Sequence, residues 1–278
     1  MHHKKIVLLS IFLVALGLRF VLCIYNREAN DNHMEVINWI LHNHSLPAKE
    51  DCWECSQPKA WYLLNVGILN AFHIRKVEDK IIAVQMVNFV FSFFILLFLW
   101  MFINRQRYSD RLKLFSFALV ALNPCLIGIN VQATNDTLAI LAGVATVYYA
   151  SLFFERLSAG TFAGMCLSVI VASIVKGSGL ILMVALVLVF AAMIAAGPRL
   201  NRRLLIKKFL LLSVFYFMIV PFAGNYYSSY RKYGDAFKNN INQKDPQPDF
   251  YHETYLLRPG ITSIVHGYFT FRIIDMIR

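Results

Sequence analysis

The sequence predicts an all-α, polytopic membrane protein with about seven transmembrane helices and an amphipathic, juxtamembrane helical loop on the outer face. Composition is the first reason. Of 278 residues, 58% are hydrophobic and 15% are charged, whereas soluble proteins average roughly 45–50% and about 25%. The mean hydropathy is +0.54. A water-soluble fold of this size could not bury that much apolar surface, so the chain is expected to lie in a membrane.

Long apolar runs are the second reason, because several can cross the hydrocarbon core of a bilayer. The first run follows a short basic start, includes Arg19 and has no small-residue cleavage site, so we interpret it as a retained signal anchor. A further candidate, 61–74, has only 14 residues and suits an interfacial or re-entrant helix better. The predicted spans are 6–24, 81–103, 112–131, 138–154, 161–175, 180–196 and 209–223.

The distribution of charge decides between seven and eight spans. A net charge of +11 would favour nucleic acid in a soluble protein, but near span ends Lys and Arg report orientation. With seven spans, the inside segments are 1–5, 104–111 with Lys113, 155–160 and 197–208. They hold twelve basic residues and two acidic ones. Counting 61–74 as a span would move two basic clusters outside, so seven spans are favoured.

The prediction divides the chain into a transmembrane domain, 1–223, and an outer-face segment, 224–278. The first outer loop covers 25–80. Val36, Ile37, Ile40 and Leu41 recur in it at helical spacing, which indicates a short amphipathic helix on the bilayer surface. The outer-face segment ends without another span, and we expect the sequence to be a fragment that is truncated before further transmembrane helices.

Two carboxylates and one lysine are the candidate site residues. Asp31 follows the first span closely, and Asp136 begins a later one; each could instead cap a helix. Lys176 interrupts an apolar stretch beside glycines, where it either snorkels to the interface or neutralises a phosphate. The topology places all three on one side at membrane depth. Such a pocket suits a substrate that is half lipid and half phosphate.

Cys52 and Cys55 form a C-x-x-C sequence in the first outer loop. No second Cys pair or His pair with zinc spacing lies nearby in the sequence, so the signal for zinc is weak. A local disulfide or two free thiols is favoured instead. The Gln57-Pro58 turn that follows is expected to set the next helix against the membrane.

The order of these features resembles the C-type (GT-C) superfamily of polyprenyl-phosphate-dependent glycosyltransferases, especially the protein O-mannosyltransferase and lipid A aminoarabinose transferase branch. The chain has Asn-Asp-Asn-His at 30–33 as an acidic motif and Gln-Pro-Lys-Ala-Trp-Tyr at 57–62 in place of a Pro-Pro-Leu-Tyr-Tyr element. Asn135-Asp136 and a Thr-Lys-Gly-like turn at 175–177 follow, and 230–237 is similar to the Arg-Tyr-Gly-Asp-Pro-Phe stretch of many members.

The resemblance implies transfer of a sugar from a polyprenyl-phosphate donor to a hydroxyl of a protein, lipid or glycan, with inversion. Asp31 would be the general base, with Glu35 as the alternative because Asn32 stands where many members have Glu. Lys176 would bind the donor phosphate. The resemblance requires no cofactor, although paired carboxylates would also suit a divalent metal. Residues expected to support the site are His33, Gln57, Asn135 and Asp136.

The resemblance also implies a multi-pass protein of the cell inner (plasma) membrane with its site facing outside. Two alternatives stay open. A secondary transporter or lipid flippase would use intramembrane charges along a translocation path, although no internal repeat is evident. An inactive fragment of the glycosyltransferase is the other. No nucleic-acid partner is expected.

Overall fold

The computed structural model describes residues 2–25, 32–196 and 199–237. The fold is 83% helix, and these ranges contain no strand, which confirms the all-α class. In chain order the helices are α1 (His2–Tyr25), α2 (His33–Asn43), η1 (Trp53–Ser56), α3 (Ala60–Ala71), α4 (Val77–Arg105), α5 (Asp110–Ala121), α6 (Pro124–Asn130), α7 (Asp136–Arg156), α8 (Ala159–Val175), η2 (Gly177–Gly179), α9 (Leu180–Ala196), α10 (Arg199–Ala223) and α11 (Tyr226–Tyr233).

Five of these helices are long and apolar enough to cross a membrane, namely α1, α4, α7, α9 and α10. The pair α5–α6 gives a sixth crossing if the two bent helices count as one span. Helix α8 is apolar but has 17 residues, or about 25 Å at 1.5 Å per residue. The chain is therefore a multi-pass membrane protein by its helices, and the count of seven spans stays a prediction.

The predicted third span, 112–131, is wrong as a single helix. Helices α5 and α6 meet at an angle of 51°. Asn123 accepts hydrogen bonds from the backbone N–H groups of Cys125 (2.9 Å) and Leu126 (3.2 Å), and Pro124 is the first residue of α6. An Asn-Pro pair starts a new helix in this way because Asn caps well and Pro suits the first turn.

Arg19 of α1 stabilises this break. Its side chain is fully buried, and its Nη1 donates to the carbonyl oxygens of Ala15 and Ala121, both at 2.9 Å. Ala121 is the last residue of α5, and the carbonyls of a helix's last turn have no N–H donor within the helix. A charged group placed inside a membrane span usually faces other helices rather than lipid. Arg19 follows that pattern here.

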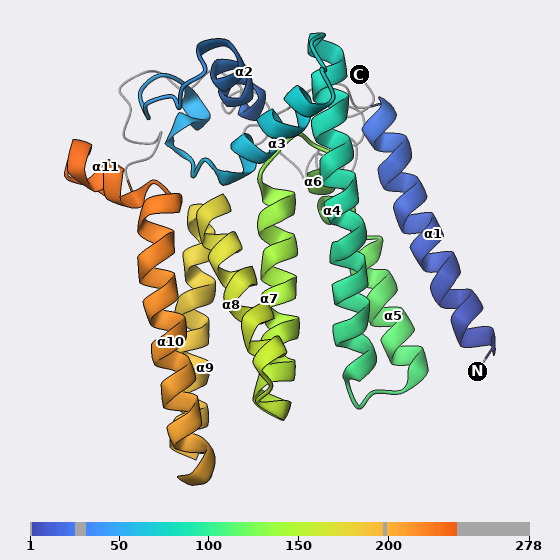
Figure 1. Cartoon of the computed structure of the whole chain (residues 1–278). Coiled ribbons are helices and arrows are strands. Elements are labelled where there is room, and N and C mark those ends of the chain that lie inside the picture. The colour runs from blue at the N-terminus through green and yellow to red at the C-terminus, as the bar shows by residue number, and fades with distance from the viewer. Residues whose placement is uncertain (1, 26–31, 197–198, 238–278) are drawn as a thin grey trace, which may run out of the picture.

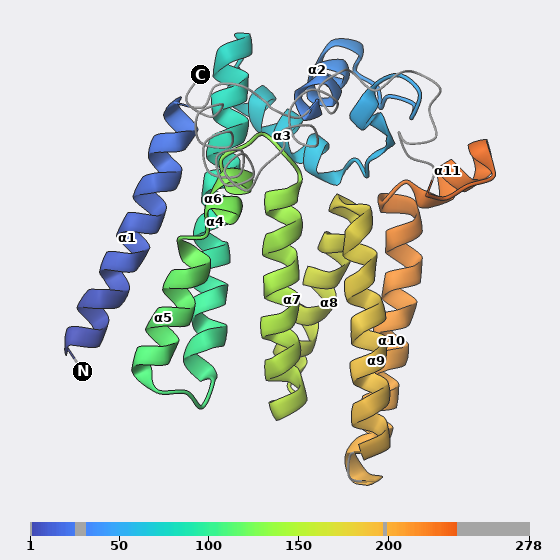
Figure 2. The same ribbon diagram turned by 180° about the vertical axis from the view of Figure 1, so that it is seen from behind.

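The elements form a bundle of long helices with small helices gathered at one end. Figures 1 and 2 show α2, α3 and α11 at that end, and the connections α4–α5, α7–α8 and α9–α10 at the other. The connections coincide with the basic segments of the sequence. Ion pairs join them, between Lys4 and Asp110 (2.6 Å) and between Arg105 and Glu155. Which membrane side each end faces stays a prediction.

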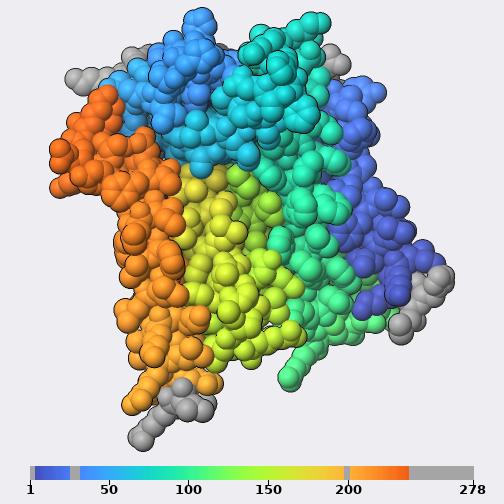
Figure 3. All heavy atoms as spheres, viewed as in Figure 1, coloured from blue at the N-terminus to red at the C-terminus, as the bar shows by residue number. Residues whose placement is uncertain are grey.

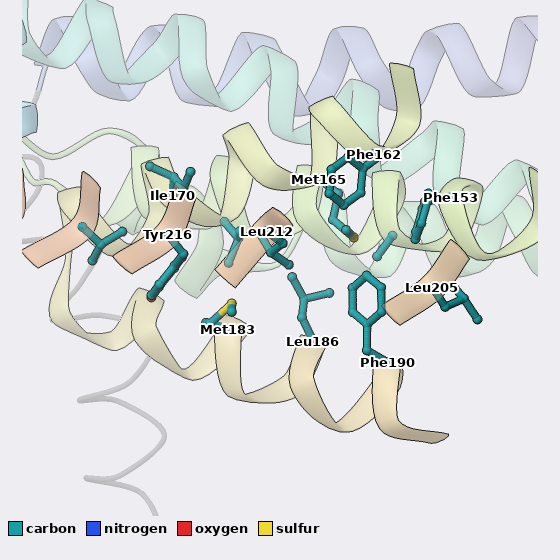
Figure 4. Close-up of a cluster of buried hydrophobic side chains, with 13 residues drawn as sticks. Phe153, Phe162, Met165, Ile170, Met183, Leu186, Phe190, Leu205, Leu212 and Tyr216 are labelled. Carbon is teal, nitrogen blue, oxygen red and sulfur yellow. The ribbon is translucent and has the colours of Figure 1, made fainter. Parts of the chain in front are cut away.

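Two clusters of buried apolar side chains position the candidate site. The larger lies between α7, α8, α9 and α10 and includes Phe153, Met165, Leu186, Phe190 and Leu212 (Figure 4). It holds α7 and α8 together as neighbours, so the end of α8 is fixed against the start of α7.

The second cluster joins the first outer loop to the bundle. It buries Ile37 of α2 and Trp61 of α3 against Ala133 and Val175, which lie beside the start of α7 and at the end of α8. The space-filling view shows the loop covering that end of the bundle (Figure 3). Helix α3 corresponds to the short candidate 61–74, and its 12 residues are too few to cross a bilayer.

The predicted outer-face segment begins with α11, and residues 238–278 lie outside the described residues. Helix α11 is tied to the first outer loop by Glu50, whose carboxylate accepts hydrogen bonds from Lys232 (2.8 Å) and Tyr233. These two donors lower the pKa of Glu50 to about 2. Both predicted outer segments therefore meet at the same end of the molecule.

Candidate functional site

An ion pair at this end brings two predicted site residues together. The Oδ1 atom of Asp136, in the first turn of α7, pairs with the Nζ atom of Lys176, which directly follows α8. The Asp136 side chain is 32% exposed and the Lys176 side chain is 28% exposed, so a ligand can reach both charged groups. Lys176 therefore has a defined carboxylate partner, while the choice between snorkelling and phosphate binding stays a prediction.

Neighbouring side chains fix the carboxylate and the lysine. Thr134 donates its hydroxyl to Asp136 Oδ2 and accepts the N–H of Asp136, both at 3.3 Å. Asn135 is fully buried, and its Nδ2 donates to the carbonyl of Val175 at 3.2 Å. Asn135 therefore ties the start of α7 to the residue before Lys176. Asn135, rather than Asp136, occupies the N-cap position of α7, and its role in supporting a site stays a prediction.

Gly177 and Gly179, which follow Lys176, differ in how much space surrounds them. A Cβ atom at Gly179 would collide with the carbonyl of Ala172, so this glycine permits close packing of the chain on α8. At Gly177 a Cβ atom would meet only the Tyr226 hydroxyl, at 4.0 Å. Tyr226 donates that hydroxyl to the carbonyl of Ser173 at 2.8 Å. Open space beside Lys176 is therefore bounded on one side by a tyrosine of α11.

A chain of hydrogen bonds connects the first outer loop to the ion pair. Trp61 Nε1 donates to Asn88 Oδ1 at 3.3 Å. Asn88 Nδ2 then donates to the carbonyls of Gln132 (2.6 Å) and Thr134 (2.8 Å). Asn88, Thr134 and Tyr226 were not among the residues predicted from the sequence. An amide inside an apolar run, as Asn88 is, was the available signal.

The predicted base and its alternative both belong to the first outer loop. Asp31, the proposed base, lies outside the described residues, and the N-cap of α2 is Asn32. Glu35 is exposed in the first turn of α2, and partial desolvation raises the pKa of its carboxyl. It forms no ion pair with the described part of the chain, so its carboxylate is available to a ligand.

The other two predicted supporting residues belong to the loop's own structure. His33 is buried, and its Nδ1 shares a hydrogen bond of 2.6 Å with the Tyr62 hydroxyl. Gln57 is half-buried at the end of η1, and its N–H donates to the carbonyl of Glu54 at 3.1 Å. Both residues support the packing of α2 and α3 over the bundle end.

Cys52 and Cys55 form a disulfide, one of the two states expected for this pair. Next to it, Lys59 is 3% exposed and donates from Nζ to the carbonyl of Cys55 at 2.5 Å. Burial, and next the charge of Lys49, lower the pKa of Lys59 to about 8. The sequence argument treated Lys59 only as a replacement for a proline and missed this buried cation.

In the described ranges no group of three or more His, Cys, Asp or Glu side chains is arranged to hold a metal ion. Scans against protein-family models, curated proteins and solved structures found no match to this chain.

Proposed function

We propose that this protein is a membrane glycosyltransferase that moves a sugar from a polyprenyl-phosphate donor to an acceptor hydroxyl at the outer membrane surface. One observation supports the proposal above the others. Asp136 and Lys176 come from separate helices and meet at the bundle end opposite the basic segments, under the first outer loop. By the positive-inside rule, that end faces away from the cytoplasm.

The chemistry of this position suits a lipid-linked sugar. The prenyl chain of the donor lies among the helices, and its phosphate reaches the interface, where Lys176 is a compact positive charge. In the transfer, a carboxylate takes the proton of the acceptor hydroxyl, whose oxygen bonds to the anomeric carbon. The bond from that carbon to the phosphate oxygen breaks, and the phosphate leaves with the electron pair. A nearby fixed cation lowers the barrier to that departure.

We assign the base to Asp31, with Glu35 one helical turn further on as the alternative. A single base with direct displacement inverts the anomeric centre, as it does in inverting glycosidases. The raised pKa of Glu35 suits proton transfer, since a base works best with a pKa near the operating pH. The protein or glycan acceptor would approach from outside the membrane.

The base assignment is tested by conservative substitution. Asp31→Asn keeps the size of the side chain but removes its basic oxygen. If Asp31 is the base, membranes with this variant transfer radiolabelled sugar from a polyprenyl phosphate about 100-fold more slowly or worse. An active Asp31→Asn beside an inactive Glu35→Gln would move the role to Glu35. Two active variants would exclude this loop as the source of the base.

A transporter or lipid flippase is the second candidate, and two observations favour it. Buried Arg19 and the bent pair α5–α6 are features found along translocation paths. The two functions differ in a simple measurement. Proteoliposomes with a fluorescent polyprenyl phosphate in one leaflet report flipping without any acceptor; flux from the unaltered protein would support this function, and no flux would exclude it for this lipid.

A further inference from the structure

Lys176 already has an anionic partner, which changes what a phosphate must do to bind there. Asp136 Oδ1 forms an ion pair with Lys176 Nζ, and the Thr134 hydroxyl donates a hydrogen bond to Asp136 Oδ2. The pair keeps about a third of its exposure. Ion pairs with that much exposure are weak, since solvent screens the attraction and two flexible side chains must be ordered. An incoming phosphate can therefore compete with Asp136.

We propose that the donor phosphate replaces Asp136 at Lys176 and thereby releases the Asp136 carboxylate to bind the acceptor hydroxyl. The inference rests on the proposed function and adds to it that donor binding prepares the site for the acceptor. Before the donor binds, Lys176 neutralises the Asp136 carboxylate and occupies one side of Oδ1, so the acceptor hydroxyl meets a weaker hydrogen-bond acceptor. After the exchange, Lys176 neutralises the phosphate, while Asp136 remains anchored through Thr134. Donor binding should then strengthen acceptor binding.

The surroundings of the pair permit such an exchange. Gly177 leaves space next to Lys176, bounded by the Tyr226 hydroxyl at 4.0 Å. The backbone is held by Asn135, whose Nδ2 contacts the carbonyl of Val175. Helices α7 and α9 both begin at this end, and helix N-termini favour anions. The side chains can thus change partners while the backbone that positions them stays in place.

The exchange predicts opposite effects for two neutralising variants on binding of a short prenyl phosphate. Asp136→Asn removes the competitor, so detergent-solubilised protein should bind farnesyl phosphate about two- to fivefold more tightly, as expected for loss of a partly exposed ion pair. Lys176→Ala should weaken binding about tenfold or more. In the double variant the gain from Asp136→Asn should disappear, because it acts only through Lys176.

Controls separate this inference from the proposed function. Glu50→Gln breaks a comparable ion pair at the same bundle end, with Lys232, and should leave binding unchanged. Farnesol, which lacks the phosphate, reports partition of the lipid alone. If Lys176→Ala weakens binding but Asp136→Asn does not strengthen it, the exchange is wrong and the donor site stands. If the unaltered protein binds farnesyl phosphate no better than farnesol, both are wrong.

A binding measurement covers the case in which Asp136→Asn folds poorly. For the unaltered protein, an acceptor that supports transfer should bind more tightly when farnesyl phosphate is present than when it is absent. Acceptor binding of equal strength with and without farnesyl phosphate would overturn the exchange.

Discussion

At the scale of single residues, Lys59 shows how burial adjusts a charged group in the loop over the site. Its amine donates to the carbonyl of Cys55 and lies 5.9 Å from the centre of the Tyr62 ring. Because little water reaches it, the protonated form is disfavoured and the pKa falls to about 8. Tyr62 in turn bonds His33, so Lys59 connects the disulfide to the start of α2.

The lowered pKa of Lys59 predicts a pH dependence of stability. Below about pH 8 the amine is protonated in both folded and unfolded chains. Between about 8 and the ordinary value of 10.5, the unfolded chain holds a proton that the folded chain has lost, so the free energy of unfolding rises with pH. Thermal unfolding in detergent across this range should show the rise in the unaltered protein and a smaller rise in Lys59→Met. Parallel profiles would contradict the buried position of the amine.

The sequence predicted some site residues but not how they are held. Asp136 and Lys176 were predictable because charges at the ends of apolar runs are rare and costly. Asn88 could not be assigned a role, since its amide donates to the backbone carbonyls of Gln132 and Thr134, which only the folded chain brings near. Lys59 was missed because a lysine in a loop is normally exposed.

At the scale of elements, the bend between α5 and α6 depends on local capping. Asn123→Ala removes the acceptor for two N–H groups at the start of α6 and should lower the free energy of unfolding by about 1 kcal/mol. Asn123→Ser retains a capping oxygen and should lose much less. Equal losses in both variants, measured by thermal unfolding in detergent, would contradict the role of the cap.

The apolar runs predicted where the long helices lie, but they did not predict the break between α5 and α6. The runs at 81–103, 138–154 and 180–196 lie within α4, α7 and α9, because hydrophobic length is a strong signal in membrane proteins. The run at 112–131 concealed a break, because Leu122 and Pro124 are apolar and Asn123 is a single polar residue. The contact of Arg19 with Ala121 spans about a hundred positions and has no local signal.

At the scale of the whole molecule, the charge pattern and the helix arrangement agree. The basic segments lie at one end of the bundle, and the two predicted outer segments gather at the other (Figures 1 and 2). This arrangement places the Asp136–Lys176 pair on the side that the positive-inside rule assigns to the exterior. The membrane orientation is the next property to measure.

Cysteine labelling tests that orientation. With the native free cysteines replaced, of which Cys125 is exposed, single cysteines at Asn70 and Ser228 should react with a membrane-impermeant thiol reagent added outside intact cells. Cysteines at Ser109 and Asn201 should react only after the membrane is permeabilised. Labelling of a cysteine at Ser109 or Asn201 in intact cells would show that the orientation is reversed or that the number of spans differs.

Transfer in proteoliposomes tests the central claim most directly. The purified full chain is supplied with radiolabelled polyprenyl-phosphate sugars and a mixture of acceptor hydroxyls, and labelled product is counted for Lys176→Ala and for Lys232→Ala, a lysine ion-paired at the same bundle end. The proposed function predicts product with the unaltered protein and Lys232→Ala, and a loss of about tenfold or more with Lys176→Ala. No product from any donor, or equal product from both variants, would contradict it.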